Sequence, residues 1–160
     1  MATRQRPLEI VLTREGADLL RAELAELVDV ARPASLRRVQ AACEQGDGEG
    51  GPEVGAARWE QSRIEARIAR LEDQLRVARI IDAADLDGDA VAPGHRVGVR
   101  RADGTEREYV LVSPIEADPA HGRLSVESPL GRALLGRVPG DEVRLPNSDA
   151  PVVVTAVGAP

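Results

Sequence analysis

The first half of the chain carries apolar residues at helical spacing in two stretches. Within each stretch the steps alternate between four and three residues, which is the pattern of a coiled-coil seam. The two seams are Leu20, Leu24, Leu27, Ala31, Ala34 and Ile64, Ile68, Leu71, Leu75, Ala78. Between them lies the segment GDGEGGP at residues 46–52, which interrupts any helix. The pattern therefore predicts two helices joined by a short tip.

The two seams also mirror each other. In an antiparallel hairpin, the residue numbers of two facing positions add up to a nearly constant value. That value is 98 for Leu20 with Ala78 and 100 for Leu36 with Ile64, and the intermediate pairs fall between. We therefore expect residues 1–81 to form an antiparallel coiled-coil hairpin.

Three details of this hairpin follow from single residues. Thr13 is a candidate N-cap for the first helix. Pro33 removes a backbone donor, so we expect the first helix to bend or break there. Helices of about 30 residues span about 45 Å at 1.5 Å per residue. The hairpin is thus predicted to be long, with an acidic tip at residues 46–53.

The second half of the chain changes to a period of two. Residues 82–94 are acidic, contain Gly and Pro, and are predicted to be a linker. Beyond it, residues 95–160 are predicted to form a small, mostly β domain, so the fold class is α+β. The expected strands contain Val97 and Val99, Tyr109 to Val112, Leu124 and Val126, Val143 and Leu145, and Val152 to Val157.

One short helix is expected inside this β-rich half. It begins at Pro129 with Ser128 as N-cap, runs to Leu135, and stops at Gly136.

Composition excludes several function classes. All 21 basic residues are Arg, and the net charge of −6 leaves little positive charge for a DNA backbone. Trp59 and Tyr109 are the only aromatic residues, too few to stack successive bases. The single Cys43 fits a reducing compartment, and no segment has the roughly 18 consecutive apolar residues of a membrane span. We expect a cytoplasmic protein that does not bind DNA independently or enter membranes.

Sequence motifs for catalysis are weak. Gly46, Gly48 and Gly51 spell a dinucleotide-binding pattern, but that pattern follows a strand and here it follows a predicted helix. His95 and His121 lack partners at metal-ligand spacing and are expected at the surface. No catalytic triad can be assembled, so we expect that the chain is not an enzyme.

The acidic tip is the most site-like feature. Asp47, Glu49 and Glu53 lie at the end of the predicted hairpin. They could simply keep an exposed turn in solution, or the hairpin could carry them into a cavity of another macromolecule. Carboxylate oxygens suit Mg²⁺ that is shared with the acids of a partner. No cofactor of the chain's own is expected beyond a magnesium ion shared through Asp47 and Glu49.

The chain resembles, almost end to end, the Gre family of bacterial transcript-cleavage and elongation factors. The residues that carry the resemblance are LTREGADLLRAEL (12–24), ARP (31–33), EQGD (44–47), AAR (56–58), RIEARIARLEDQL (63–75), ARIID (78–82) and SVESPLGRALLGRVPGDEV (125–143). The resemblance implies a coiled coil followed by an FKBP-like domain. It also implies a partner, bacterial RNA polymerase: the coiled coil enters the secondary channel and the globular domain docks on its rim. Glu127, Ser128 and Pro129 match the family's docking element.

The tip departs from the cleavage-competent members of that family. Those members carry a Glu three residues after the Asp that matches Asp47, whereas this chain has Gly50 there and Glu49 one place away. Glycines around the tip also raise the entropy cost of ordering it. We therefore expect a monomeric factor that binds the secondary channel and inhibits or modulates transcription without stimulating RNA cleavage, with Asp47, Glu49 and Glu53 near the polymerase active centre.

Three alternatives remain open. The chain could be a cleavage factor that rescues backtracked complexes with Asp47 and Glu49. It could be a prolyl isomerase, although Tyr109 is the only aromatic residue available for such a pocket. Finally, it could be a purely structural coiled-coil protein.

Overall fold

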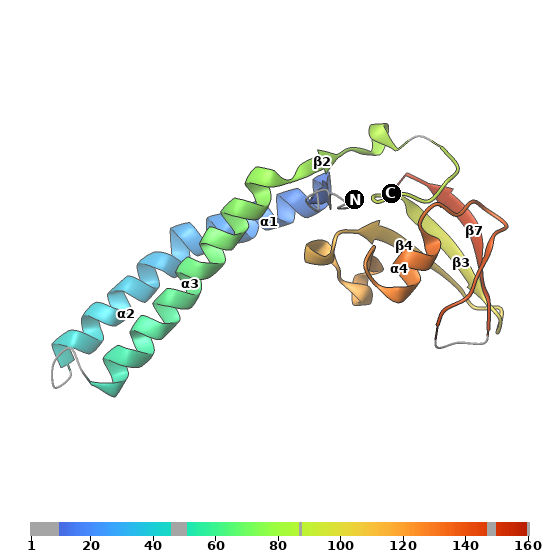
Figure 1. Ribbon diagram of the computed structural model, residues 1–160. Helices are drawn as coiled ribbons and strands as arrows, with labels where there is room; N and C mark the ends of the chain where they lie inside the picture. Colours follow the sequence, from blue (N-terminus) through green and yellow to red (C-terminus); the bar gives the residue numbers. More distant parts are fainter. Residues whose placement is uncertain (1–9, 46–50, 87, 147–149, 160) are drawn as a thin grey trace, which may run out of the picture. The chain divides into compact units, whose positions relative to one another are not determined.

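The computed structural model describes residues 10–45, 51–86, 88–146 and 150–159 (Figure 1). The fold is α+β, with a long helical hairpin followed by a curled β-sheet domain. The contacts divide the described chain into two compact units. One comprises residues 17–77, and the other joins residues 10–16 to residues 78–159. The sequence alone predicts a hairpin boundary at residue 81, whereas the contacts end the helical unit at residue 77.

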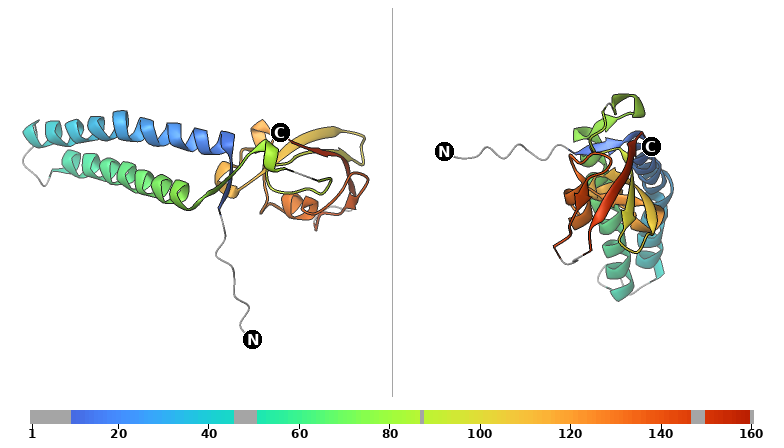
Figure 2. Two further views of the ribbon diagram at one scale, coloured as in Figure 1. Left: turned by 90° about the horizontal axis from the view of Figure 1, so that it is seen from above. Right: turned by 90° about the vertical axis from the view of Figure 1, so that its right-hand side faces the viewer.

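The hairpin unit has two long antiparallel arms. Three helical segments follow one another directly in the first arm: α1 (Arg14–Glu26), the π-helical turn η1 (Leu27–Ala31) and α2 (Arg32–Gln45). The second arm is the single helix α3 (Pro52–Val77), which lies beside α2 in both views of Figure 2. The predicted hairpin is confirmed. None of the helices in the part of the chain described here is long and apolar enough to cross a membrane.

The interruption expected at Pro33 takes the form of the π turn. In η1 the backbone nitrogen of Arg32 donates to the carbonyl of Leu27, five residues earlier. A π turn fits one extra residue into the helix, so the side chains that follow are rotated relative to the heptad pattern. Ser35 is buried as a result, whereas Ala34 and Leu36 are exposed. The seam predicted from sequence is therefore wrong at these two positions.

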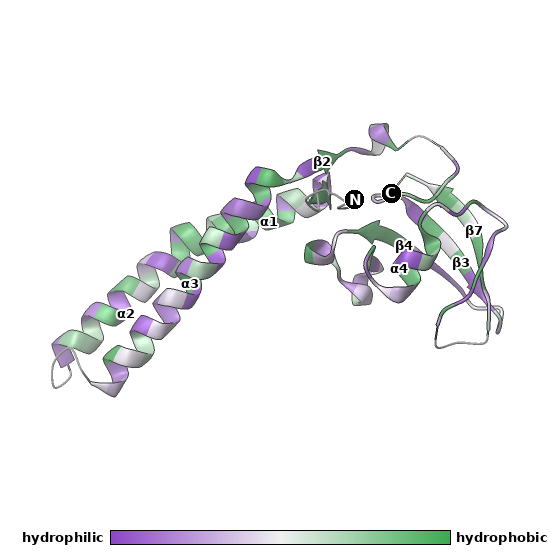
Figure 3. Ribbon diagram, in the orientation of Figure 1, coloured by the Kyte–Doolittle hydropathy of each residue, from purple (hydrophilic) through white to green (hydrophobic). Residues whose placement is uncertain are grey.

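The second arm keeps its predicted seam. Ile68 and Leu71 are buried, and Ile64 and Leu75 are half-buried. Hydrophilic residues make up much of the rest of the hairpin (Figure 3). Among the described residues, three ion pairs join the two arms: Arg32 with Glu65, Arg38 with Glu60, and Arg67 with Glu23.

The second unit contains a five-stranded sheet in the order β5-β4-β3-β7-β6. Strand β3 pairs antiparallel with β4 and β7, β6 pairs antiparallel with β7, and β5 pairs parallel with β4. The strand bounds are β3 (Arg96–Arg101), β4 (Glu106–Val112), β5 (Arg123–Ser125), β6 (Glu142–Val143) and β7 (Val152–Gly158). Five predicted strand regions are thus confirmed.

Two further strands were not predicted. The strand β1 (Val11–Thr13) pairs in parallel with β2 (Arg79–Ile81), and this small sheet brings the two ends of the hairpin sequence together. Three short 3₁₀ helices complete the unit: η2 (Ala83–Asp85), η3 (Pro114–Glu116) and η4 (Pro119–His121).

The core of this unit is aliphatic. It contains Val91, Val97, Val99, Tyr109, Leu111, Leu124, Leu134, Val143, Val152 and Val154. Leu134 belongs to the predicted short helix, which is present as α4 (Pro129–Leu134) and ends before Gly136 with its φ of 75°. Val91 lies in the predicted linker but is buried.

His95 is also buried, contrary to the prediction, while His121 is exposed as expected. The Nδ1 atom of His95 accepts a hydrogen bond from the backbone nitrogen of Ala92, so the ring closes a tight turn before β3. The alternation of apolar and polar residues does not predict the burial of a histidine whose ring accepts a hydrogen bond from the backbone.

Candidate functional site

The turn between β5 and α4 holds the predicted docking residues in a defined conformation. Ser128 Oγ donates to the carbonyl of Ser125 over 2.7 Å and accepts from the backbone nitrogen of Gly131 over 3.0 Å. The backbone nitrogen of Glu127 donates to Ser125 Oγ over 3.1 Å. Ser128 is therefore half-buried and structural, whereas Glu127 and Pro129 are exposed on either side of it. These three residues form what we call the Glu127 turn, residues 127–129.

Close packing beneath this turn depends on a glycine. A Cβ atom at Gly131 would lie 2.1 Å from the carbonyl oxygen of Ser125, which is well inside van der Waals contact. Because any side chain would push the first turn of α4 away from β5, the residue at position 131 has to be glycine for this geometry. The Glu127 turn is thus rigidly supported from inside.

An apolar hollow of about 430 Å³ opens beside the Glu127 turn. Its lining is mostly aliphatic and comes from the residues before and within β1, the segment before β3, the η3 region and the end of β5. The lining residues are Ile10, Val11, Pro93, Ser113, Pro114, Ile115, Val126 and Glu127. Glu127 supplies a carboxylate at this mostly apolar hollow.

A buried carboxylate fastens β1 to the same region. The side chain of Glu116 is 1% exposed and forms an ion pair with Arg123, whose side chain is 13% exposed, over 3.0 Å. It also accepts hydrogen bonds from the backbone nitrogen and the hydroxyl of Thr13 and from Ser113 Oγ. Burial of a charge is costly unless it is paired and hydrogen-bonded, and Glu116 meets both conditions.

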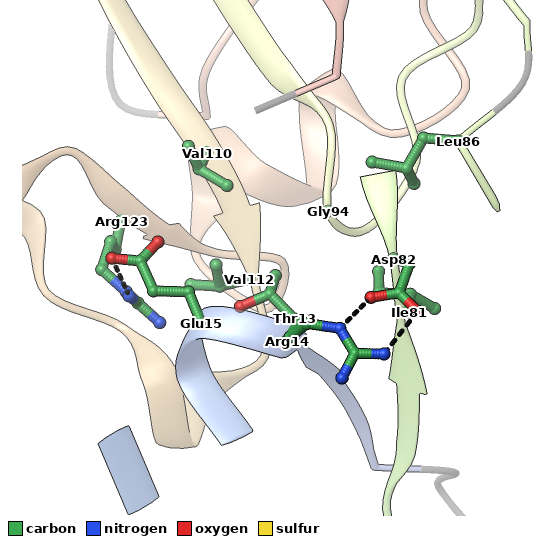
Figure 4. Close-up of a pocket in the computed structure, with 10 residues that line it drawn as sticks. All are labelled: Thr13, Arg14, Glu15, Ile81, Asp82, Leu86, Gly94, Val110, Val112 and Arg123. Atoms are coloured by element: carbon green, nitrogen blue, oxygen red, sulfur yellow. Dashed lines mark hydrogen bonds and ion pairs between the residues drawn. The ribbon is translucent and has the colours of Figure 1, made fainter. Parts of the chain in front are cut away.

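A second cavity, of about 240 Å³, lies between β1, β2 and β4 (Figure 4). Aliphatic side chains including Ile81 and Val110 line it, and two ion pairs flank it. Arg14 binds Asp82 through both carboxylate oxygens, and this interaction lowers the pKa of Asp82. Arg123 lies 3.8 Å from Glu15. Since each of these arginines already faces a carboxylate, the cavity offers little free positive charge to an anionic ligand.

At the tip, the structure describes only part of the predicted acidic group. Glu53 lies in the first turn of α3, is exposed, and is well placed to interact with the helix dipole. Asp47 and Glu49 lie outside the described residues, so the predicted tip site and its shared magnesium remain predictions. Among the residues that are described, no group of three or more His, Cys, Asp or Glu side chains could hold a metal ion.

Comparison with known proteins gives a consistent result along the chain. Residues 10–80 match the family model described as "Transcription elongation factor, N-terminal", and residues 86–158 match "Transcription elongation factor, GreA/GreB, C-term". Transcription elongation factor GreA of Rhodospirillum rubrum is 42% identical over 152 residues, which cover 93% of this chain and 97% of that protein. The chain belongs to the GreA/GreB family of transcription elongation factors.

Other members of the family show comparable similarity. Transcription elongation factor GreA of Lactococcus lactis subsp. cremoris is 41% identical over 136 residues, covering 84% of this chain and 87% of that protein. GreA factor homolog 1 (Gfh1) of Thermus thermophilus has a solved structure and is 30% identical. The match covers 94% of this chain and 99% of that one, with a TM-score of 0.44.

In this Gre-family chain, sequence reasoning located the Glu127 turn but missed what supports it. The Ser-Pro pair at a helix start was visible, because Ser at the N-cap and Pro at the first helical position form a recognisable signal. Glu116 gave no such signal, since it lies in a short 3₁₀ helix without a hydrophobic period and its partner Thr13 is 103 residues away. The short apolar run Ile10, Val11, Leu12 was the available hint of β1.

Proposed function

We propose that this Gre-family chain binds bacterial RNA polymerase, inserts its hairpin into the secondary channel, and obstructs or modulates transcription without stimulating RNA cleavage. The observation that supports insertion most directly is the hairpin itself. Helix α3 alone has 26 residues, which corresponds to about 39 Å at 1.5 Å per residue. In the described residues, two helical arms side by side form this element, so it is slender enough to enter a narrow pore as a monomer.

The Glu127 turn is proposed to dock on the rim of that channel. Its three residues match the family's docking element, and its backbone is held in place by Ser125 and Gly131. A rigid turn loses little conformational entropy on binding, which favours affinity. The neighbouring apolar hollow offers room for a side chain of the docking partner.

The absence of cleavage stimulation is proposed from the tip sequence. Placing a metal ion for catalysis requires ligands held to within about 0.5 Å. The tip has Asp47, but Gly50 occupies the position of the family's catalytic Glu, and Glu49 is displaced by one residue. The proposed role is therefore steric, and any chemistry belongs to the polymerase. The prolyl isomerase alternative gains no support, because Tyr109 packs into the core and is 9% exposed.

A binding measurement tests the docking half of the proposal. The double variant Glu127→Gln/Pro129→Ala is expected to weaken capture of core RNA polymerase by about tenfold, as the loss of an interface anchor would. The double variant Glu142→Gln/Pro139→Ala is the matched control, since both residues are exposed in the same unit. Equal affinity of the two variants would contradict docking through the Glu127 turn.

A cleavage assay tests the other half. Backtracked elongation complexes incubated with the protein and Mg²⁺ are expected to release no more 3′ RNA fragment than complexes alone, while initiation slows. Fragment release that is abolished by Asp47→Asn or Glu49→Gln would instead establish the cleavage-factor alternative. In that case, Asp47 and Glu49 would hold a magnesium ion jointly with the polymerase, and that ion would support RNA cleavage.

A further inference from the structure

The side of α3 that faces away from α2 carries an exposed tryptophan paired with an arginine. The residue Trp59 is 65% exposed, the largest exposed fraction among the exposed large apolar residues in the described chain. The guanidinium carbon of Arg63 lies 4.9 Å from the centroid of the indole ring, a cation–π contact one helical turn away. The buried residues of α3 are Val54, Ala57, Ile68 and Leu71, and their spacing places Trp59 and Arg63 on the opposite face.

This pair belongs to a longer face with a distinct chemistry. At steps of three and four residues, the outward side of α3 presents Ala56, Trp59, Arg63, Ala66 and Arg70, all of them exposed. We call this set the Trp59 face. Between Ala56 and Arg70 it contains two arginines and no carboxylate, although the whole chain has a net charge of −6. The next residue at this spacing is Asp73, and its carboxylate pairs with Arg76. The neighbouring acids Glu60 and Glu65 pair instead with arginines of α2.

The composition of the Trp59 face suits a protein partner. Trp and Arg are the residues most often found as energetic anchors of protein interfaces, and small residues beside them allow close approach of another surface. Stacking of RNA bases fits less well, because Arg63 already covers the indole ring and the hairpin has no second aromatic residue. A cationic surface is complementary to an acidic one.

We propose that the Trp59 face docks on an acidic protein surface of RNA polymerase that offers an apolar recess for the indole ring. This inference rests on the proposed function and adds a second contact to it, on the hairpin and separate from the Glu127 turn. The ring enters the recess, while Arg63 and Arg70 pair with carboxylates around it. The contact sets affinity for the polymerase and is independent of the tip carboxylates.

The test measures affinity for core polymerase that carries no nucleic acid, using full-length chain labelled at its N-terminus. The variant Trp59→Ala is expected to raise the Kd about tenfold, and Arg63→Glu is expected to raise it at least as much through charge reversal. Leu36→Ala is the matched control, because Leu36 lies on the other arm of the hairpin and is 49% exposed. Its Kd is expected to stay within about twofold, as for a contact outside an interface core.

A spectroscopic readout complements the affinities. Trp59 is the only tryptophan, so 5-fluorotryptophan labelling gives a single ¹⁹F resonance from the chain. This resonance is expected to shift or broaden when unlabelled core polymerase is added. If Trp59 has a purely structural role, the chemical shift of this resonance should stay at its value in the free protein. The line would then broaden only through the slower tumbling of the complex, and a second label in the β-sheet unit measures that broadening.

The outcomes separate this inference from the function on which it rests. If the wild-type chain binds through Glu127 and Pro129 while Trp59→Ala binds equally well, the Trp59 face is not an interface and the proposed function stands. If the effect of Trp59→Ala appears only in complexes with extruded RNA, the face contacts RNA and the inference is overturned. If the wild-type chain does not bind core polymerase, both proposals fail.

Discussion

Thr13 and Glu116 are 103 residues apart in the chain and share three hydrogen bonds. The Thr13 hydroxyl donates to Glu116 Oε1 over 2.5 Å, and the Thr13 backbone nitrogen lies 3.3 Å from both carboxylate oxygens. The same hydroxyl accepts from the backbone nitrogen of Gly16 over 3.0 Å, as an N-cap does. One side chain thus both begins α1 and ties β1 to Glu116.

The variant Glu116→Gln is expected to lower the free energy of unfolding by about 3 kcal/mol, as the breaking of a buried ion pair does. The amide keeps the shape of the side chain, but it leaves Arg123 without its buried counter-charge. It also places an NH₂ group, which is a donor, next to hydrogen-bond donors such as the Ser113 hydroxyl. Urea denaturation followed by circular dichroism measures the change.

Its control is Glu106→Gln, where an exposed carboxylate 3.9 Å from Arg100 is neutralised. Exposed ion pairs contribute at most about 1 kcal/mol, so this variant should remain close to wild type. A Glu116→Gln protein as stable as Glu106→Gln would show that the buried network does not hold β1.

Replacing Gly131 by alanine is expected to destabilise the fold by about 1–3 kcal/mol, the usual cost of overpacking. The new Cβ would meet the Ser125 carbonyl at 2.1 Å, so either β5 or the start of α4 must shift. Thermal unfolding measures the loss, and binding to polymerase is expected to weaken with it because the Glu127 turn moves.

Gly55→Ala provides a control of opposite sign. Gly55 lies in α3 with no atom within 4 Å of the new Cβ, so alanine should stabilise the helix by about 0.5–1 kcal/mol. If both glycine variants changed stability in the same direction, steric contact at Ser125 would not be the cause.

The hairpin is expected to lose stability in acid. Hydrogen bonds from Arg32 and Arg67 lower the pKa values of Glu65 and Glu23 below their ordinary value of 4.5. A carboxyl group with a lowered pKa in the folded state stabilises that state above the unfolded pKa, and the contribution disappears as the pH falls below it. The contribution is therefore full at neutral pH and fades below about pH 4.5.

The measurement compares melting temperatures of wild type and the Glu23→Gln/Glu65→Gln variant between pH 7 and pH 3. Wild type is expected to have a higher melting temperature than the double variant at pH 7. This difference in melting temperature should shrink toward zero at pH 3. The effect is small because the side chains of Glu23 and Glu65 are 41% and 42% exposed, so solvent screens both ion pairs. A gap of constant size across this range would mean that the two ion pairs do not contribute through charge.

The sequence predicted the parts of this chain that obey a regular period. The seam of α3, the strand regions and the helix that starts at Ser128 all follow local patterns of two or 3.6 residues. What it missed depends on contacts between distant segments, such as the pairing of β1 with β2 and the burial of Glu116 and His95. For the site, local capping signals located Ser128, but the hollow beside Glu127 is formed by segments that lie more than 100 residues apart in the chain, such as Ile10 and Glu127.

The π turn yields a final prediction about register. The heptad pattern places Ala34 in the seam, but after η1 the buried residue is Ser35, which is 5% exposed. Ala34→Glu is therefore expected to change the free energy of unfolding by no more than about 0.5 kcal/mol, as at other exposed positions. Ser35→Glu places a carboxylate between the two arms and should cost more than about 2 kcal/mol.

The variant Ser35→Ala separates the effect of charge from the loss of the hydroxyl, which donates to the carbonyl of Arg32 over 2.8 Å. That bond lies within one helical turn, so its removal should cost no more than about 1 kcal/mol. Urea denaturation of the three variants gives the expected order of stability: Ala34→Glu, then Ser35→Ala, then Ser35→Glu. If Ala34→Glu were the least stable, the undisturbed heptad would describe the hairpin better, and the extra residue in η1 would have no effect on packing.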